Sequence, residues 1–80
     1  MATASGSRYR LVTVQNGREH VSAVVLGHAE VPEHLHAEAV LHQATGWAVY
    51  EEPGERVVAS RPGIRREVFA RRFDPLGDVT

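Results

Sequence analysis

Histidine and glutamate are concentrated in one short part of the chain, where they could bind a metal ion. Four of the five histidines and three glutamates fall between residues 28 and 42. They are His28, His34, His36, His42, Glu30, Glu33 and Glu38. Because imidazole nitrogens and carboxylate oxygens are zinc ligands, this cluster is a candidate metal site. The same histidines could form a pH-sensitive surface, since an ordinary imidazole has a pKa of about 6.5.

Helix geometry limits the metal hypothesis. Residues 32–45 are predicted to form a helix, on which His34, Glu38 and His42 share one face. His34 and His42 are then separated by about 12 Å along the helix axis, and one ion with ligands at about 2 Å cannot reach both. These three residues are therefore weak metal candidates, no cofactor is predicted, and the simpler interpretation is a solvated polar helix face.

An Arg-rich stretch between residues 56 and 73 is the second region that could carry a function. Guanidinium groups contact phosphates and aromatic rings stack on bases, so this stretch could bind nucleic acid. The candidate contact residues are Arg61, Arg65, Arg66, Arg71, Arg72, Phe69 and Phe73. Against this, the net charge of the whole chain is −1, whereas small nucleic-acid-binding domains are usually basic. The alternative is that the arginines pair with the acidic middle of the chain, within one molecule or between subunits.

No sequence motif indicates catalysis. Ser22 and Ser60 do not lie in a nucleophile-elbow context, and there is no glycine loop of the kind that cradles phosphates. A short chain also has little room to enclose a substrate. We therefore do not expect an enzyme.

The composition indicates one small folded domain over residues 1–80. A chain of 80 residues buries only about 60 to 65% of the surface that its unfolded form exposes, and the absence of cysteine excludes disulfides. Small domains without such cross-links often depend on a partner subunit. No apolar stretch approaches the roughly 18 residues needed to span a membrane, so we expect a cytoplasmic protein with no membrane contact.

The first half of the chain predicts a hairpin. Residues 9–14 have strand composition, and Asn16-Gly17 is typical of a type I′ turn. A two-residue loop would place Val14 opposite Glu19 and the following strand residues in the same register. The unbroken apolar run over residues 23–26 predicts a strand buried on both faces at the centre of the sheet. Residues 1–7 and 76–80 are expected to be frayed.

The predicted helix has apolar residues on two sides. Pro32 suits its first turn, and Gly46 suits the position just after its end. The stripe expected to pack on the sheet consists of Ala37, Val40, Leu41 and Ala44. Leu35 and Ala39 form a weaker strip on the other side, which another subunit or a terminal segment could cover.

Further strands are predicted after the helix. Residues 47–50 and 56–59 flank Pro53-Gly54, which suits a type II turn, in a loop that we expect to exceed two residues. Residues 64–73 match neither the helical nor the strand period well, and a strand is the preferred interpretation over a helix. Asp74-Pro75 is expected to end it.

The predicted fold is therefore α+β, a mainly antiparallel sheet of four or five strands with one helix on one face, in the order ββαβββ. The predicted function is a non-catalytic interaction module that acts through protein–protein contacts and forms a homodimer. Nucleic-acid binding through residues 56–73 is the alternative. The sequence does not identify the partner.

Overall fold

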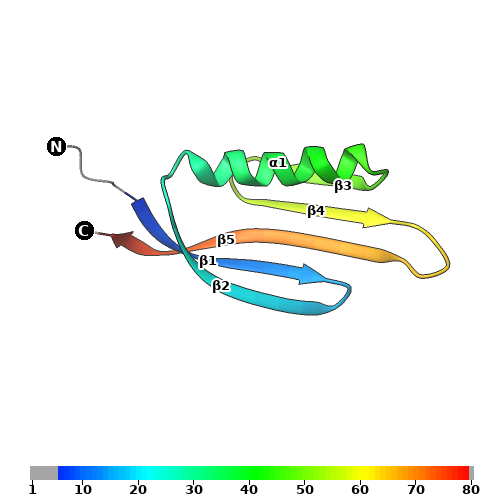
Figure 1. Ribbon diagram of the computed structural model, residues 1–80, viewed down its shortest axis with the longest axis horizontal. Coiled ribbons are helices and arrows are strands. Elements are labelled where there is room, and N and C mark those ends of the chain that lie inside the picture. The colour runs from blue at the N-terminus through cyan, green and yellow to red at the C-terminus, as the bar shows by residue number, and fades with distance from the viewer. Residues whose placement is uncertain (1–5, 80) are drawn as a thin grey trace.

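The computed structural model describes residues 6–79, which form one antiparallel sheet and one helix (Figure 1). In chain order the elements are β1 (Gly6–Gln15), β2 (Arg18–Leu26), α1 (Glu30–Ala44), β3 (Ala48–Glu52), β4 (Arg56–Arg61) and β5 (Glu67–Val79). The strands are arranged in the order β2-β1-β5-β4-β3. The predicted α+β class and the element order ββαβββ are confirmed, and the segment after residue 64 continues into a strand rather than a helix.

The β1–β2 hairpin has the predicted turn and register. Asn16 and Gly17 both have positive φ, at 51° and 82°, as a type I′ turn requires. Val14 lies opposite Glu19, and the pairing continues without a slip along both strands. The turn is also joined to β5, because Asn16 N–H donates to the Val68 carbonyl at 2.9 Å and Val68 N–H donates to Asn16 Oδ1 at 3.0 Å.

The predicted central position of the apolar run in β2 is wrong. Within residues 6–79, β2 is an edge strand whose one partner is β1, and α1 packs over β3, β4 and part of β5. Figure 1 accordingly shows β2 at the edge of the sheet that lies farthest from the helix. The sequence run is apolar although the strand lies at the exposed edge of the sheet.

The expected frayed ends and the expected stop at Asp74-Pro75 also need correction. β1 begins at Gly6, and β5 continues through Asp74 and Pro75 to Val79, opposite the start of β1. The register between these strands shifts between Arg8 and Tyr9, beside Pro75. A bulge is a place where proline, which lacks an N–H donor, is tolerated in a sheet. The rest of the predicted frayed ends, residues 1–5 and 80, lies outside the described residues.

The helix begins two residues earlier than predicted, and the prediction of its packing face is wrong. Val31, Leu35 and Ala39 are the buried residues of α1, whereas Val40 and Leu41 of the predicted stripe are 50% and 56% exposed. The strip assigned to another subunit or a terminal segment therefore faces the sheet. Histidine side chains on this face pack against aromatic rings of β5, so a sequence pattern that counts histidine as polar selects the wrong side.

One hydrophobic core lies between α1 and the sheet. Leu35 and Val57 are fully buried in it, and the remaining buried members are Tyr9, Val31, Ala39, Ala59, Phe69 and Phe73. In the β3–β4 loop, Gly54 has φ 75°, and Glu55 N–H donates to the Glu52 carbonyl at 2.9 Å. The predicted turn is therefore confirmed, in a loop longer than two residues. No helix within residues 6–79 is long and apolar enough to span a membrane.

Candidate interaction surface

The face of the sheet turned away from α1, here named the open face, carries an apolar strip. Directly opposite residues of antiparallel strands place their side chains on the same face, and Val12, opposite Val21 and Arg72, lies outside the core cluster under the helix. The strip comprises Val25, Val21, Val12, Val14, Ala70, Val58 and Tyr50. Val21, Val25 and Tyr50 are 52%, 59% and 59% exposed. This strip crosses the sheet from one edge strand to the other.

Charged side chains surround the apolar strip. Arg56 Nε lies 2.6 Å from Glu52 Oε1, and Arg72 Nε lies 3.1 Å from Asp74 Oδ1. Arg10 lies between Ala23 and Asp74 in the register of the same face. An apolar centre within a mixed charged rim is typical of protein–protein interfaces.

The open face carries a small hollow. The hollow has a volume of about 90 Å³ and is lined by Val12, Val14, Arg56, Val58, Ala70, Arg71 and Arg72. Pockets for small organic ligands usually measure about 300 to 1,000 Å³. The open face is therefore suited to contact with another folded surface rather than to enclosing a small molecule.

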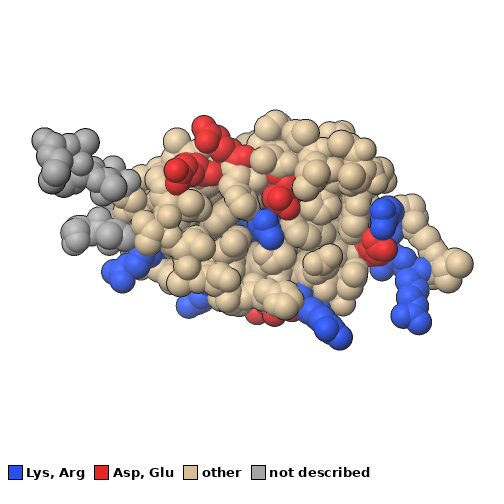
Figure 2. All heavy atoms as spheres, viewed as in Figure 1, with Lys and Arg blue, Asp and Glu red and all other residues tan. Residues whose placement is uncertain are grey.

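The Arg-rich segment does not form a single surface. Phe69 and Phe73 are buried in the core. Arg65 and Arg66 are exposed between β4 and β5, while the other three arginines lie on strands: Arg72 on the open face, and Arg61 and Arg71 on the helix side. Figure 2 shows the basic side chains scattered over the visible surface and acidic side chains gathered over the first half of α1. The sheet separates Arg72 from Arg61 and Arg71, and the two phenylalanines are buried, so the seven residues do not form one surface.

Arg71 connects the sheet to the helix. Its Nε donates to Thr13 Oγ1 at 3.0 Å, and its Nη1 lies 3.0 Å from His34 Nε2 and 3.5 Å from Glu38 Oε1. The guanidinium also lies 5.3 Å from the centre of the Phe69 ring. Because a guanidinium only donates, His34 Nε2 accepts in this contact. At Arg71 the Arg-rich segment therefore pairs with the acidic helix of the same molecule. This is the predicted alternative in which the arginines pair with the acidic middle of the chain.

The helix face that carries the three weak metal candidates packs on the sheet, so the expectation of a solvated face is wrong for it. The His42 ring stacks on Phe69 with centroids 4.2 Å apart and meets Trp47 edge-on at 5.1 Å. The His34 ring meets Phe73 edge-on at 5.2 Å. Within residues 6–79 no group of three or more His, Cys, Asp or Glu residues is placed to hold a metal ion. These side chains serve the packing of α1.

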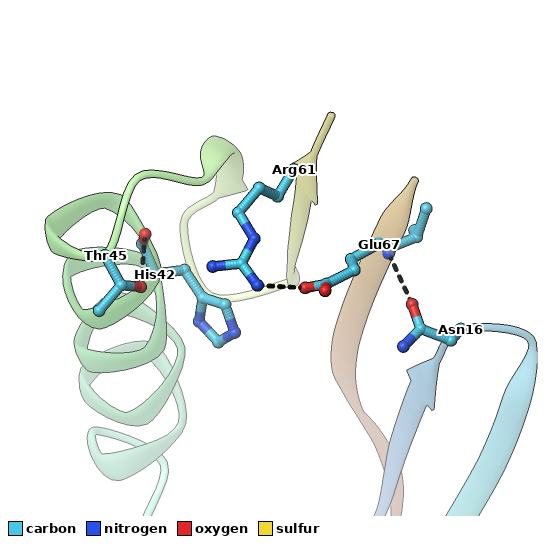
Figure 3. A network of polar contacts seen from close by, with 6 residues as sticks. Asn16, His42, Thr45, Arg61 and Glu67 are labelled. Carbon is cyan, nitrogen blue, oxygen red and sulfur yellow. Dashed lines mark hydrogen bonds and ion pairs between the residues drawn. The ribbon is translucent and has the colours of Figure 1, made fainter. Parts of the chain in front are cut away.

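Figure 3 shows polar contacts near the C-terminal end of α1. Arg61 Nη2 lies 2.6 Å from Glu67 Oε2, and the Arg61 guanidinium lies 5.1 Å from the Trp47 ring centre. Thr45 Oγ1 donates to the His42 carbonyl at 3.0 Å, which satisfies one of the free carbonyls at the helix end. Arg61 is thereby held against the helix side of the sheet instead of the open face.

A cavity that the sequence did not predict lies near the start of α1. It has a volume of about 480 Å³ and is lined by Ser7, Tyr9, His28, Val31, Pro32, Gly54, Phe73, Pro75 and Gly77. His28 lies between two hydroxyls, with Nε2 3.1 Å from Ser7 Oγ and Nδ1 3.2 Å from Tyr9 Oη. The residues were missed because Ser7 was placed in a frayed end and His28 was grouped with the helix histidines.

Serine beside imidazole is an arrangement that can activate a nucleophile. Here Ser7 is only 3% exposed, so its hydroxyl is shielded from a substrate in this conformation. In a neutral imidazole one nitrogen donates and the other accepts, and a hydroxyl can take either role. The contacts join the β2–α1 connection to β1, and we assign them a structural role.

Comparison with known proteins gives no relative: no family model, no curated protein and no solved structure matches this chain. The physical character of the surface is therefore the basis for a functional proposal.

Proposed function

We propose that this chain is a small non-catalytic interaction module that acts through protein–protein contacts and associates with a second copy of itself. The observation that carries the proposal is the apolar strip on the open face, where Val21, Val25 and Tyr50 are all more than half exposed. The exposed part of the strip lies on the two edge strands, because Val12 between them is only 2% exposed. Exposed apolar side chains within a polar rim mark interaction sites in soluble proteins. The cytoplasmic location stays a prediction.

The uncovered second face of the sheet supports the proposal that the chain binds a partner. Within the described residues α1 covers only part of one face of the sheet, and the core cluster lies between α1 and that face. The open face has no covering layer among the described elements. A sheet with one face packed and one face apolar gains stability by burying the second face against another molecule.

Nucleic-acid binding through residues 56–73 has weaker support. Phe69 and Phe73 are buried, so they offer no rings on which bases could stack. Arg71 is engaged with Glu38 and Thr13, and Arg72 pairs with Asp74. These contacts reduce the number of arginines available for phosphates.

Two measurements separate these functions. Sedimentation equilibrium from low to high micromolar concentration should give a mass that rises from one chain to two. An NMR titration with short DNA and RNA at low salt should leave the amide shifts of residues 61–73 unchanged. A single-chain mass throughout would refute self-association, and salt-sensitive shifts confined to residues 61–73 would favour the nucleic-acid alternative.

A further inference from the structure

We propose that the self-association uses the edge of β2, which pairs antiparallel with β2 of a second copy across a two-fold axis near Ala23. The two five-stranded sheets would then join into one continuous sheet. This inference rests on the proposed self-association and adds its geometry and its residues.

The backbone of β2 has unused pairing capacity. Among the strands that the structure describes, β2 pairs with β1 alone, and alternate residues of an antiparallel strand direct their N–H and C=O groups to opposite sides. The two-residue turn makes Gln15 and Arg18 the closing hydrogen-bonded pair. The outward groups are consequently those of Glu19, Val21, Ala23 and Val25, which can pair with another strand.

The side chains of β2 do not protect this edge. The strand is nine residues long and has no charged side chain from Val21 to Leu26. Natural sheets usually guard exposed edges with charges, prolines or short strands, because a long apolar edge recruits other chains. The opposite edge strand, β3, follows that rule: it has five residues, among them Glu51 and Glu52.

The sequence of β2 is self-complementary when two copies of the strand pair antiparallel with Ala23 opposite Ala23. In that register Val21 lies opposite Val25 of the second copy, and Ser22 lies opposite its Val24. Glu19 lies opposite Gly27 of the second copy, so no two like charges face each other directly. Apolar β-branched pairs across strands are favourable. A two-fold interface requires such self-complementarity, and this is why the occupant is a second copy.

The joined sheet would also extend the apolar strip. Val21 and Val25 lie on the open face beside Val12 and Arg8, and a two-fold axis perpendicular to the sheet keeps the open faces of both copies on the same side. The strips of the two molecules would meet at Ala23. The β2 contact would leave this longer strip uncovered, so that a further protein partner could bind it.

Three lysine variants of equal charge test the interface by sedimentation equilibrium. Ala23→Lys places two ammonium groups beside the two-fold axis, near Arg10 of each copy. Ala48→Lys is the matched control, because Ala48 is also exposed and lies on the open face of the other edge strand. Leu41→Lys tests the exposed outer side of α1. Ala23→Lys should raise the dimer dissociation constant about tenfold or more, while the other two variants should leave it unchanged.

A gain-of-signal measurement keeps the test valid if Ala23→Lys does not fold. The chain has no cysteine, so Ala23→Cys introduces a single thiol. Directly opposite hydrogen-bonded residues have Cα atoms about 5.5 Å apart, within the usual disulfide range. Oxidation should give a covalent dimer of Ala23→Cys much faster than of Ala48→Cys.

The outcomes separate the inference from the proposed function. A wild-type dimer that is weakened by Ala48→Lys or Leu41→Lys, but not by Ala23→Lys, would overturn the β2 interface and leave self-association intact. Equal cross-linking of both cysteine variants would overturn it in the same way. A wild-type chain that stays monomeric at high micromolar concentration would overturn both.

Discussion

The imidazole of His42 lies stacked on the ring of Phe69, with the centroids 4.2 Å apart and the planes inclined by 24°. This contact joins the last turn of α1 to β5 and places a histidine against the sheet. His34, about two turns earlier on the same helix face, meets the Phe73 ring edge-on. The orientation of the helix is therefore set by aromatic contacts of its histidines together with the burial of Leu35.

Leucine-to-alanine substitutions on the two sides of α1 test this orientation. Leu35→Ala should lower the free energy of unfolding by about 2 to 5 kcal/mol, because Leu35 is fully buried. Leu41→Ala should change it by less than about 0.5 kcal/mol, since Leu41 is mostly exposed. Urea unfolding followed by circular dichroism measures both. A larger loss for Leu41→Ala would mean that the originally predicted stripe faces the sheet.

The stacked histidine should contribute to stability. His42→Ala removes the contacts with Phe69 and Trp47 and the 2.8 Å hydrogen bond to the Glu38 carbonyl, and should cost about 2 kcal/mol. His42→Phe keeps a ring and should recover part of the loss. The neighbouring exposed Gln43→Ala serves as control and should be nearly neutral. Equal unfolding midpoints for His42→Ala and Gln43→Ala would contradict the packing role.

Arg71 and Arg72 are neighbours with different expected effects. The Arg71 side chain is only 20% exposed and contacts Thr13, His34 and Glu38, so Arg71→Ala should cost about 2 kcal/mol. Arg72 is more exposed and, among the described residues, pairs with Asp74, so Arg72→Ala should cost less than about 1 kcal/mol. Arg71→Lys should recover little, because an ammonium lacks the guanidinium fork. The reverse order of the two alanine variants in urea unfolding would refute this assignment.

The turn at Asn16 should show two separable contributions. Asn16→Ala loses the side-chain bond to Val68 N–H and puts a β-carbon at φ 51°, with an expected total cost of about 2 kcal/mol. Asn16→Gly loses the same bond but tolerates the positive φ, and should cost about half as much. Thermal unfolding under identical conditions checks the order. A glycine variant less stable than the alanine variant would contradict the conformational explanation.

Local patterns predicted most of the fold. Asn16-Gly17 determined the first hairpin and its register, and Pro53-Gly54 determined the second turn, because both signals act through backbone conformation within a few residues. Packing was harder to predict. The apolar run in residues 23–26 has the composition of a central strand, but an exposed apolar edge strand has the same composition as a buried one.

The sites depended on contacts between distant residues, which periodicity does not reveal. His34 and His42 were grouped as polar, although their rings lie on Phe73 and Phe69. The Arg-rich segment was read as one surface, although strand alternation sends Arg71 and Arg72 to opposite faces. A strand over residues 64–73 by itself predicts that these two arginines lie on opposite faces. The contact of Ser7 with His28 had no sequence signal.

Amide hydrogen exchange along β2, measured at low and at high protein concentration, tests the β2 interface most directly. In a single chain the N–H groups of Val21, Ala23 and Val25 point away from the sheet and should exchange rapidly, while those of Ser22 and Val24 are protected by β1. At high concentration the amides of Val21, Ala23 and Val25 should become protected as β2 pairs with its copy. Rapid exchange of these three amides in a sample that sedimentation shows to be dimeric would contradict the β2 interface.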